Sequence, residues 1–172
     1  MGRWNFSSGP MCGLMLALVF NVAADAAGAQ SSASPSPTAW PVAEVQDQTR
    51  SLVAEAEKNP GGIATLTLSK ASGSYVMLSV RVKNGRAELH ARDSDYIFVI
   101  DGEGTMRTGG SIVDGKTVAA NEIRGLKLEG SSDTALEKGS MIHIPPGVPH
   151  QTMVAPGGKL IYFVVKAEKP AQ

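Results

Sequence analysis

The chain has 172 residues, 42% of them hydrophobic, and its 16 Lys and Arg residues equal its 16 Asp and Glu residues in number. This length and apolar content predict a globular protein with one hydrophobic core and one domain. Because the basic residues are scattered rather than gathered into a stripe, the electrostatic footprint of nucleic-acid binding is missing, and no nucleic-acid partner is expected.

The first thirty residues have the pattern of a secretory signal. Arg3 supplies the positive start, residues 11–22 form an uncharged apolar run, and small residues predict cleavage after Ala29 or, alternatively, after Ala26. A permanent membrane anchor is the weaker interpretation, because a spanning helix needs about 20 apolar residues and an acidic residue ends this run earlier. We predict a signal peptide over residues 1–29 and a periplasmic or secreted mature protein without membrane contact.

The only cysteine of the sequence, Cys12, lies inside this signal segment. It stands at the start of the apolar run, whereas a lipid-attachment cysteine is expected at its end, so lipidation is disfavoured. The mature chain then has no thiol and must be stable in an oxidising compartment without disulfides. This excludes cysteine nucleophiles and thiolate metal ligands.

Residues 30–41 predict a flexible linker, and residues 42–169 predict the folded domain. The linker is rich in Ser, Ala and Pro, with too few apolar residues to offset the entropy lost on ordering. Apolar residues at helical spacing then predict one short helix over residues 45–58, which ends at the Asn-Pro-Gly-Gly stretch 59–62.

Beyond residue 62 the pattern predicts strands. Short β-branched, aromatic and aliphatic runs between turn residues are typical of an antiparallel sandwich or barrel, and the lack of alternating helices argues against an α/β fold. Asn84-Gly85 predicts a tight hairpin, because both central residues of a type I′ turn need a positive φ. The predicted fold class is therefore all-β. The predicted strands are 63–68, 75–82, 87–90, 96–100, 105–108, 141–144, 152–154 and 160–165.

The segment 110–137 has a weaker pattern. Residues 112–115 are compatible with a turn, and residues 121–130 with either a strand or an irregular lid. We interpret the segment as an insertion between two halves of a barrel. Long structured loops near a barrel mouth often carry function, and a decorative loop is an equal alternative.

All three histidines lie in two segments. Residues 85–102 read GRAELHARDSDYIFVIDG and contain His90, and residues 139–150 read GSMIHIPPGVPH and contain His143 and His150. These segments resemble the two motifs of the cupin superfamily, G-x5-H-x-H-x(3,4)-E-x6-G and G-x5-P-x-G-x2-H-x3-N, and the chain is similar to small secreted bacterial cupins. The resemblance covers most of the mature chain. It implies a jelly-roll β-barrel with a pocket inside, and a homodimer.

The second motif matches this sequence better than the first does. It is present at Gly139, Pro145, Gly147 and His150, and Val154 replaces its final Asn. Four fixed positions at the correct spacing make this a specific signal.

The first motif departs from the pattern. Counted forward from His90, the second His falls on Arg92 and the acid on Tyr96, whereas counted back from the closing glycine the acid falls on Asp95. Gly85 lies one residue nearer to His90 than the pattern requires, which indicates a lost loop residue.

The resemblance implies a site for a divalent transition metal such as Fe, Mn, Zn, Ni or Cu, which cupins hold through three His and one Glu. Carried over residue by residue, it gives His90 and His150 as ligands and Asp95 as a stand-in for the Glu. His143 is a further candidate from the facing arm of the second motif. A plain strand role for His143 and a turn role for Asp95 stay open.

Strand parity places Glu88, His90 and Arg92 on one face. Arg92 is then a candidate clamp for an anionic substrate, or else a surface charge. Tyr96 is a candidate substrate contact, or else an aromatic that fills the barrel. Glu88 and Asp93 are alternative oxygen donors for the metal.

The leading functional hypothesis is an exported cupin that binds a small polar or anionic organic molecule in its barrel. A divalent metal would act there as a Lewis acid or oxygen activator, as in a dioxygenase-like or isomerase-like enzyme. The alternative is a non-catalytic binding or sensing module that keeps the fold and has lost its metal. The altered first motif favours this alternative.

Overall fold

The computed structural model describes residues 37–169, and the elements below belong to one compact unit that begins at Ala39. The predicted signal peptide and most of the predicted linker lie outside the described residues. No helix in the described part is long and apolar enough to cross a membrane.

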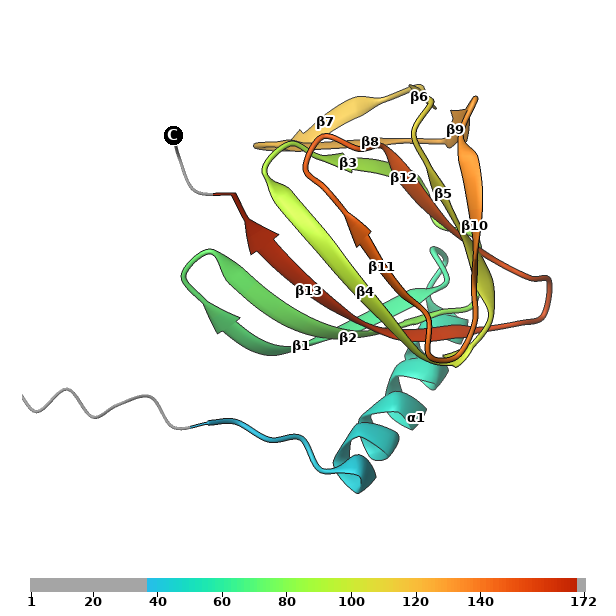
Figure 1. The fold of residues 1–172 in the computed structure, drawn as a ribbon. Helices are drawn as coiled ribbons and strands as arrows, with labels where there is room; N and C mark the ends of the chain where they lie inside the picture. Colours follow the sequence, from blue (N-terminus) through green and yellow to red (C-terminus); the bar gives the residue numbers. More distant parts are fainter. Residues whose placement is uncertain (1–36, 170–172) are drawn as a thin grey trace, which may run out of the picture. The chain divides into compact units, whose positions relative to one another are not determined.

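Antiparallel strands account for most of the described chain and form two large sheets and a small one (Figure 1). The five-stranded sheet contains, in spatial order, β1 (Ile63–Ala71), β2 (Ser74–Arg81), β13 (Leu160–Glu168), β4 (Asp93–Gly102) and β11 (Met141–Ile144). The six-stranded sheet contains β10 (Ser132–Leu136), β5 (Gly104–Thr108), β12 (His150–Val154), β3 (Ala87–His90), β8 (Glu122–Gly125) and β7 (Lys116–Ala119). The small sheet pairs β6 (Ser111–Val113) with β9 (Lys127–Glu129).

The strand order mixes early and late parts of the chain. β13, the last strand, lies between β2 and β4, and β12 lies between β5 and β3. Two facing antiparallel sheets whose neighbours are distant in sequence make a jelly roll, in which no strand needs a parallel crossover helix. The predicted all-β fold with jelly-roll topology is confirmed.

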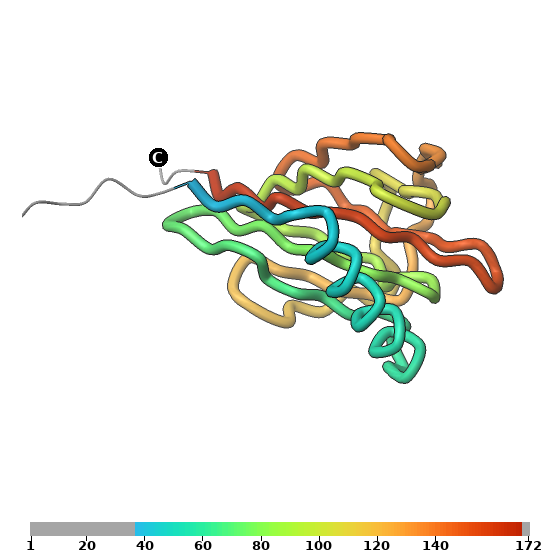
Figure 2. The backbone as a smooth tube through the Cα atoms, turned by 90° about the horizontal axis from the view of Figure 1, so that it is seen from below, coloured from blue at the N-terminus to red at the C-terminus, as the bar shows by residue number. Residues whose placement is uncertain are grey.

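The helix α1 (Val42–Lys58) packs against the outer face of the five-stranded sheet, as Figure 2 shows from below. Leu52 and Ala56 are buried there against Leu78 and Val80 of β2. The helix begins three residues before the predicted start because the Pro41 carbonyl accepts a hydrogen bond from the amide of Val45, at 3.1 Å. The helix thus shields the part of the outer face over β1 and β2 from water, and the opposite face of the sheet lines the interior.

The interior between the two sheets changes character along its strands. On β4 the inward residues Val99 and Ile97 are buried in an apolar cluster, and the next inward residue, Asp95, is buried and charged. β13 repeats this order, with Val164 in the apolar cluster and Lys166 beyond it. The strands therefore close one end of the interior with hydrophobic packing and line the other end with polar groups.

The segment 110–137 is not an insertion between barrel halves, because three of its five strands, β7, β8 and β10, belong to the six-stranded sheet of the barrel. β8 pairs with β3, and β10 pairs with β5. The strands are only three to five residues long, so alternation was hard to detect in the sequence. Gly125 makes the alternation of β8 still harder to detect, because it places a residue without a side chain at a buried position. A β-carbon there would stand 2.4 Å from the carbonyl oxygen of Val113, so only glycine fits.

The hairpin predicted at Asn84-Gly85 is also wrong. The flanking strands β2 and β3 belong to different sheets, and neither residue has a positive φ. The loop is instead held against β12, because Asn84 Oδ1 accepts a hydrogen bond from the amide of Val154 at 3.0 Å and the Gly85 amide donates to the carbonyl of Thr152 at 2.7 Å.

Candidate functional site

The polar end of the interior holds a cavity of about 260 Å³ lined by both large sheets. Its walls come from β1, β2, β4 and β13 on one side and from β3, β8 and β12 on the other. The charged and imidazole groups most relevant to its chemistry are Glu88, His90, Asp95, Arg124, His150 and Lys166.

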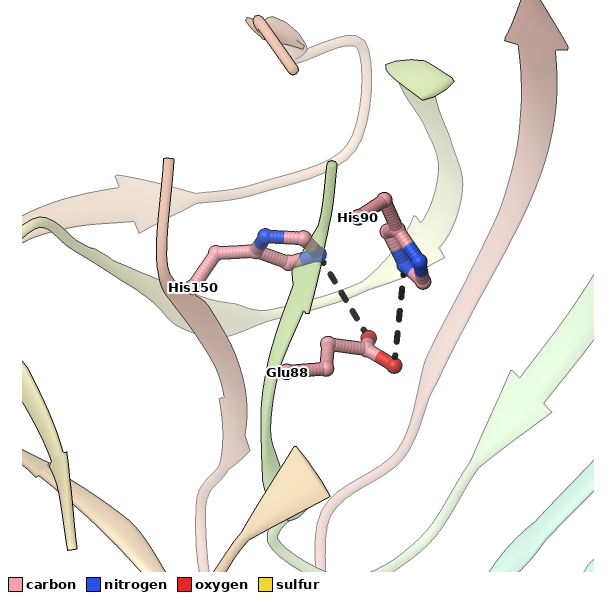
Figure 3. Close-up of side chains that lie close together, drawn as sticks. All are labelled: Glu88, His90 and His150. Carbon is pink, nitrogen blue, oxygen red and sulfur yellow. Dashed lines mark ion pairs between the residues drawn. The ribbon is translucent and has the colours of Figure 1, made fainter. Parts of the chain in front are cut away.

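Glu88, His90 and His150 form a compact group of potential ligands in this cavity (Figure 3). Glu88 and His90 are two residues apart on β3 and so point to the same side, and His150 lies opposite Glu88 in the β12–β3 pair. One ligand atom from each residue lies within 4.8 Å of the others. Nε2 of His150 is 3.5 Å from Oε1 of Glu88, and Nε2 of His90 is 3.9 Å from its Oε2.

Asp95 reaches the same group from the opposite sheet. Its Oδ2 atom lies 3.6 Å from Nε2 of His150 and 3.7 Å from Nε2 of His90. Its Oδ1 atom accepts a hydrogen bond from Nζ of the buried Lys166 at 2.5 Å. Asp95 is therefore placed between the two imidazoles by an ion pair on its far side.

The separations between these atoms fit a metal ion better than direct hydrogen bonds. In the described chain neither histidine Nε2 atom has a hydrogen-bond partner, although both are buried. Distances of 3.5 to 3.9 Å are too long for good hydrogen bonds. Two ligand atoms each about 2.1 Å from one ion stand about 3.0 to 4.2 Å apart. The donor atoms thus have the spacing of a coordination shell.

The backbone fixes the orientation of His150. Its Nδ1 atom lies 3.0 Å from the carbonyl oxygen of Val148, which can only accept, so Nδ1 carries a hydrogen. In the neutral ring, Nε2 then presents its lone pair to the carboxylates. Metal-binding histidines are commonly oriented in this way by a carbonyl behind the ring.

The charges of the cavity are strongly coupled. Burial favours the neutral form of Glu88, but its contact with His150 and the charges of His150 and Arg124 outweigh burial and lower its pKa to about 2. Burial likewise favours neutral His150, but its contacts with Asp95 and Glu88 raise its pKa to about 9. Burial and the charge of Lys166 lower the pKa of His90. Without a metal, a protonated His150 therefore lies between two carboxylates, beside a neutral His90.

The two carboxylates beside the histidines, Glu88 and Asp95, each form an ion pair with a cationic side chain. Arg124 of β8 contacts Oε2 of Glu88 at 3.1 Å and also pairs with Glu122 at 2.5 Å. Lys166 forms the corresponding ion pair with Asp95. Sequence reasoning missed both cations. Lys166 had a usable signal, since a lysine continues the inward-facing alternation of an otherwise apolar strand, whereas Arg124 lay in the segment interpreted as an insertion.

The structure also corrects the register of the first motif. Glu88 occupies the place of the first His, His90 that of the second, and Asp95 that of the acid, followed by six residues and Gly102. The expectation that His90 is the first His and that the loop lost a residue is therefore wrong. Val82 stands where the motif has its opening glycine.

His143 and Tyr96 do not reach the cavity. They face each other in the β11–β4 pair, and their rings stack with centroids 4.3 Å apart and planes at 6°. The neighbouring pair, Ile144 and Asp95, is buried, so alternation places the stacked rings on the outer face. The proposals of His143 as a ligand and Tyr96 as a substrate contact are wrong.

Arg92 is also outside the cavity. β3 ends at His90, and the bend that follows breaks the parity on which its inward placement depended. Its guanidinium pairs with Glu168 at 3.3 Å and donates to the carbonyl of Lys169 at 3.2 Å. Arg92 ties the end of β13 to the β3–β4 turn, and the predicted substrate clamp is not formed by this residue.

Comparisons with known proteins find similar solved structures but no matching sequence family. No family model matches the sequence, and no curated protein matches it. An uncharacterized conserved protein with a double-stranded beta-helix domain from Klebsiella pneumoniae is similar at 18% identity, over 68% of this chain and 90% of the other, with a TM-score of 0.47. A cupin-like protein from Thermotoga maritima is similar at 17% identity, over 61% and 68%, with a TM-score of 0.45.

KdgF from a Halomonas species is similar at 13% identity, over 65% of this chain and 84% of the other, with a TM-score of 0.46. Identities this low transfer no activity from one protein to another. The chemistry of this chain therefore has to follow from its own residues.

Proposed function

We propose that this protein is a metal-binding cupin that holds a divalent transition metal through Glu88, His90 and His150 and binds a small polar organic molecule in the same cavity. One observation carries the proposal: two buried imidazole Nε2 atoms lack partners and converge with carboxylate oxygens at coordination distances. Leaving such atoms unpaired is costly, and a metal ion would satisfy them together.

The donor set suits a first-row metal. Two imidazoles with one carboxylate form the minimal face found in non-haem iron sites, and imidazole nitrogen also suits Zn, Cu and Ni. Asp95 is a fourth candidate, already held in place by Lys166. A bound metal would supply Lewis acidity or activate oxygen.

The residues around the donors have distinct tasks in this proposal. Arg124 orients the Glu88 carboxylate, and the Val148 carbonyl orients the His150 ring. His150 loses its proton when it coordinates, since only its neutral ring has a free lone pair at Nε2. The two sheets that line the cavity lower the local dielectric constant and so would strengthen the electrostatic contacts of a bound ligand.

The metal proposal is tested by titrating the purified mature protein with Zn²⁺ and Mn²⁺ after EDTA treatment. We expect one ion per chain, and at least a 100-fold loss of affinity in His90→Gln and His150→Gln, because each change removes one of three donors. His143→Gln is the matched control, since His143 lies outside the cavity, and it should bind like wild type.

Two results would contradict the metal proposal. One is only trace metal in wild-type protein after loading, measured by elemental analysis. The other is unchanged affinity in both cavity variants, which would move the binding site elsewhere on the chain.

A second candidate, a binding or sensing module without a metal, is favoured by one observation. The contacts of protonated His150 with Glu88 and Asp95 already balance charge in the cavity. In that case His90→Gln and His150→Gln would retain affinity for the organic ligand, whereas a metalloenzyme would lose metal and turnover together.

Export is a further part of the proposal, supported by the charged start, apolar run and small residues of the first 29 residues. We expect the protein in the periplasm or the medium. N-terminal sequencing of the mature form should begin at Gln30, or at Ala27 if cleavage follows Ala26. A mature chain that retains Met1 would contradict cleavage.

A further inference from the structure

Arg81 is a buried guanidinium that faces the cavity without a carboxylate partner. It ends β2, is only 8% exposed, and lines the cavity. Within the described residues it forms no salt bridge, and its Nε atom has no hydrogen-bond partner. By contrast, Arg92, Arg107 and Arg124 each pair with an acidic side chain. A buried charge is costly unless it is paired, so Arg81 needs an explanation.

Contacts with a loop place the Arg81 guanidinium beside β12. A β-carbon added at Gly85 would stand 3.0 Å from Cζ and Nη1 of Arg81 and 3.1 Å from the carbonyl oxygen of Thr152. The guanidinium therefore packs over Gly85 next to Thr152. On β12 the inward residue before Thr152 is His150, and such neighbours stand about 7 Å apart along a strand. A small molecule can span the distance from Arg81 to the histidine group.

Hydroxyl groups surround this part of the cavity. Ser79, the inward neighbour of Arg81 on β2, is buried and shares a hydrogen bond of 3.1 Å with Thr65. Tyr162 lies opposite Ser79 on β13 and also lines the cavity. Burial raises the pKa of Tyr162, although the charge and hydrogen bond of Arg81 act in the lowering direction, so its phenol stays a donor at neutral pH.

The overall charge of the cavity also favours an anion once a metal is bound. Its lining has four carboxylates and three permanent cations, namely Asp93, Asp95, Glu88 and Glu122 against Arg81, Arg124 and Lys166. A divalent ion with neutral histidines leaves a net charge of plus one. This positive charge would attract an anionic ligand.

We infer that Arg81 is the recognition residue for the carboxylate of a small organic acid, which binds in the cavity between Arg81 and the group of Glu88, His90 and His150. The planar guanidinium matches a carboxylate with two parallel hydrogen bonds, and its Nε is the free donor. This inference rests on the proposed function, because the end of the ligand opposite the carboxylate would meet the proposed metal site. Arg81 thus takes the anion-binding role that we predicted for Arg92 from the sequence.

Malonate is a suitable probe, because it is a small acid with a neutral isostere, malonamide. Calorimetric titration of Zn²⁺-loaded wild-type protein should show malonate binding, and malonamide should bind at least tenfold more weakly. Arg81→Gln should weaken malonate at least tenfold while Zn²⁺ affinity stays within threefold of wild type. Arg81→Lys keeps the positive charge but loses the pair of parallel hydrogen bonds, so its malonate affinity should lie between those of wild type and Arg81→Gln.

Arg107→Gln is the matched control for these variants. Arg107 lies on β5 of the same barrel, is paired with Asp133 and does not line the cavity, so its variant should bind malonate like wild type. If Arg81→Gln does not fold, nitrogen NMR of wild-type protein replaces it. The Nε–H signal that is absent from the Arg81→Lys spectrum should shift on addition of malonate.

The outcomes separate this inference from the metal proposal. Equal malonate affinity in wild type and Arg81→Gln would overturn it, since binding would then come from the metal alone. Tighter binding of inorganic phosphate than of malonate would overturn the carboxylate assignment. If Zn²⁺ does not bind at all, the metal proposal fails, and the same Arg81 comparison in metal-free protein still decides the inference.

Discussion

The protonation of His150 decides the charge of the cavity when no metal is bound. Its pKa rises to about 9 because, despite burial, its ring contacts Asp95 and Glu88. A histidine with a raised pKa stabilises the folded state fully below its unfolded pKa, near 6.5, and this stabilisation is lost as the pH rises through about 9.

We therefore predict that metal-free protein loses up to about 3 kcal/mol of unfolding free energy between pH 6.5 and 9, from a shift of about 2.5 units. Urea titrations at several pH values in EDTA measure this loss. His150→Gln should show a much flatter profile over the same range. A variant that keeps the full wild-type slope would assign the pH dependence to another group.

Single residues also show what the sequence could and could not predict of the site. His90 and His150 were predictable, because the second motif is specific and the histidines are few. Arg92 was placed wrongly because strand alternation was extended beyond the end of β3 at His90. His143 was placed wrongly because its position near the second motif does not determine which side of its strand it occupies. The alternation of its strand indicated that Lys166 points inward, but not that it meets Asp95, 71 residues earlier in the sequence. Arg81 lies beside Thr152 of another sheet, and no local pattern reveals that contact.

At the scale of elements, β8 shows how a short strand can be essential. It lies between β3 and the edge strand β7 and brings Arg124 to Glu88. Its last residue, Gly125, lies so close to the β6–β7 region that an added β-carbon would be 2.2 Å from Cγ2 of Ile112. This close packing, rather than any backbone strain, requires the glycine.

We predict that Gly125→Ala lowers the free energy of unfolding by at least about 1 to 3 kcal/mol, the usual cost of overpacking. Gly61→Ala is the control, because its nearest contact would be at 3.4 Å and its φ is not positive, so it should change stability by less than about 0.5 kcal/mol. Thermal unfolding of both variants tests this pair. Equal effects would mean that the close approach at Gly125 relaxes without cost.

Whether an element could be predicted depended on its length and on how clearly its apolar residues alternate. The eight predicted strands and the helix were found, with ends shifted by up to three residues, because each has a clear apolar period. The five strands of 111–136 were missed as barrel strands because they are short and partly exposed. The pairing of β8 with β3 and of β10 with β5 provides the order that their own sequence does not.

At the scale of the whole molecule, the centre of the five-stranded sheet is made by the end of the chain. β13 pairs with β2 on one side and with β4 on the other. It also contributes Leu160, Tyr162 and Val164 to the interior cluster, and Ile161 to the cluster under α1. Both hydrophobic clusters are incomplete without it.

We predict that a chain ending at Gly158 does not fold. It loses the strand that joins the two halves of the sheet, and several buried apolar side chains, each worth about 1.5 to 3 kcal/mol, exceed the stability of an ordinary domain. Circular dichroism should show no cooperative thermal transition, whereas a chain ending at Lys169 should unfold like the full protein. A cooperative transition in the shorter chain would contradict this role of β13.

The central place of β13 has a consequence for the timing of folding. Until β13 has been synthesised, β2 and β4 have no strand to join them, so the barrel cannot close before that strand leaves the ribosome. The nascent barrel stays open until β13 is available. A chain of this kind suits the proposed export, because a polypeptide that threads through a membrane must arrive there before its fold is complete.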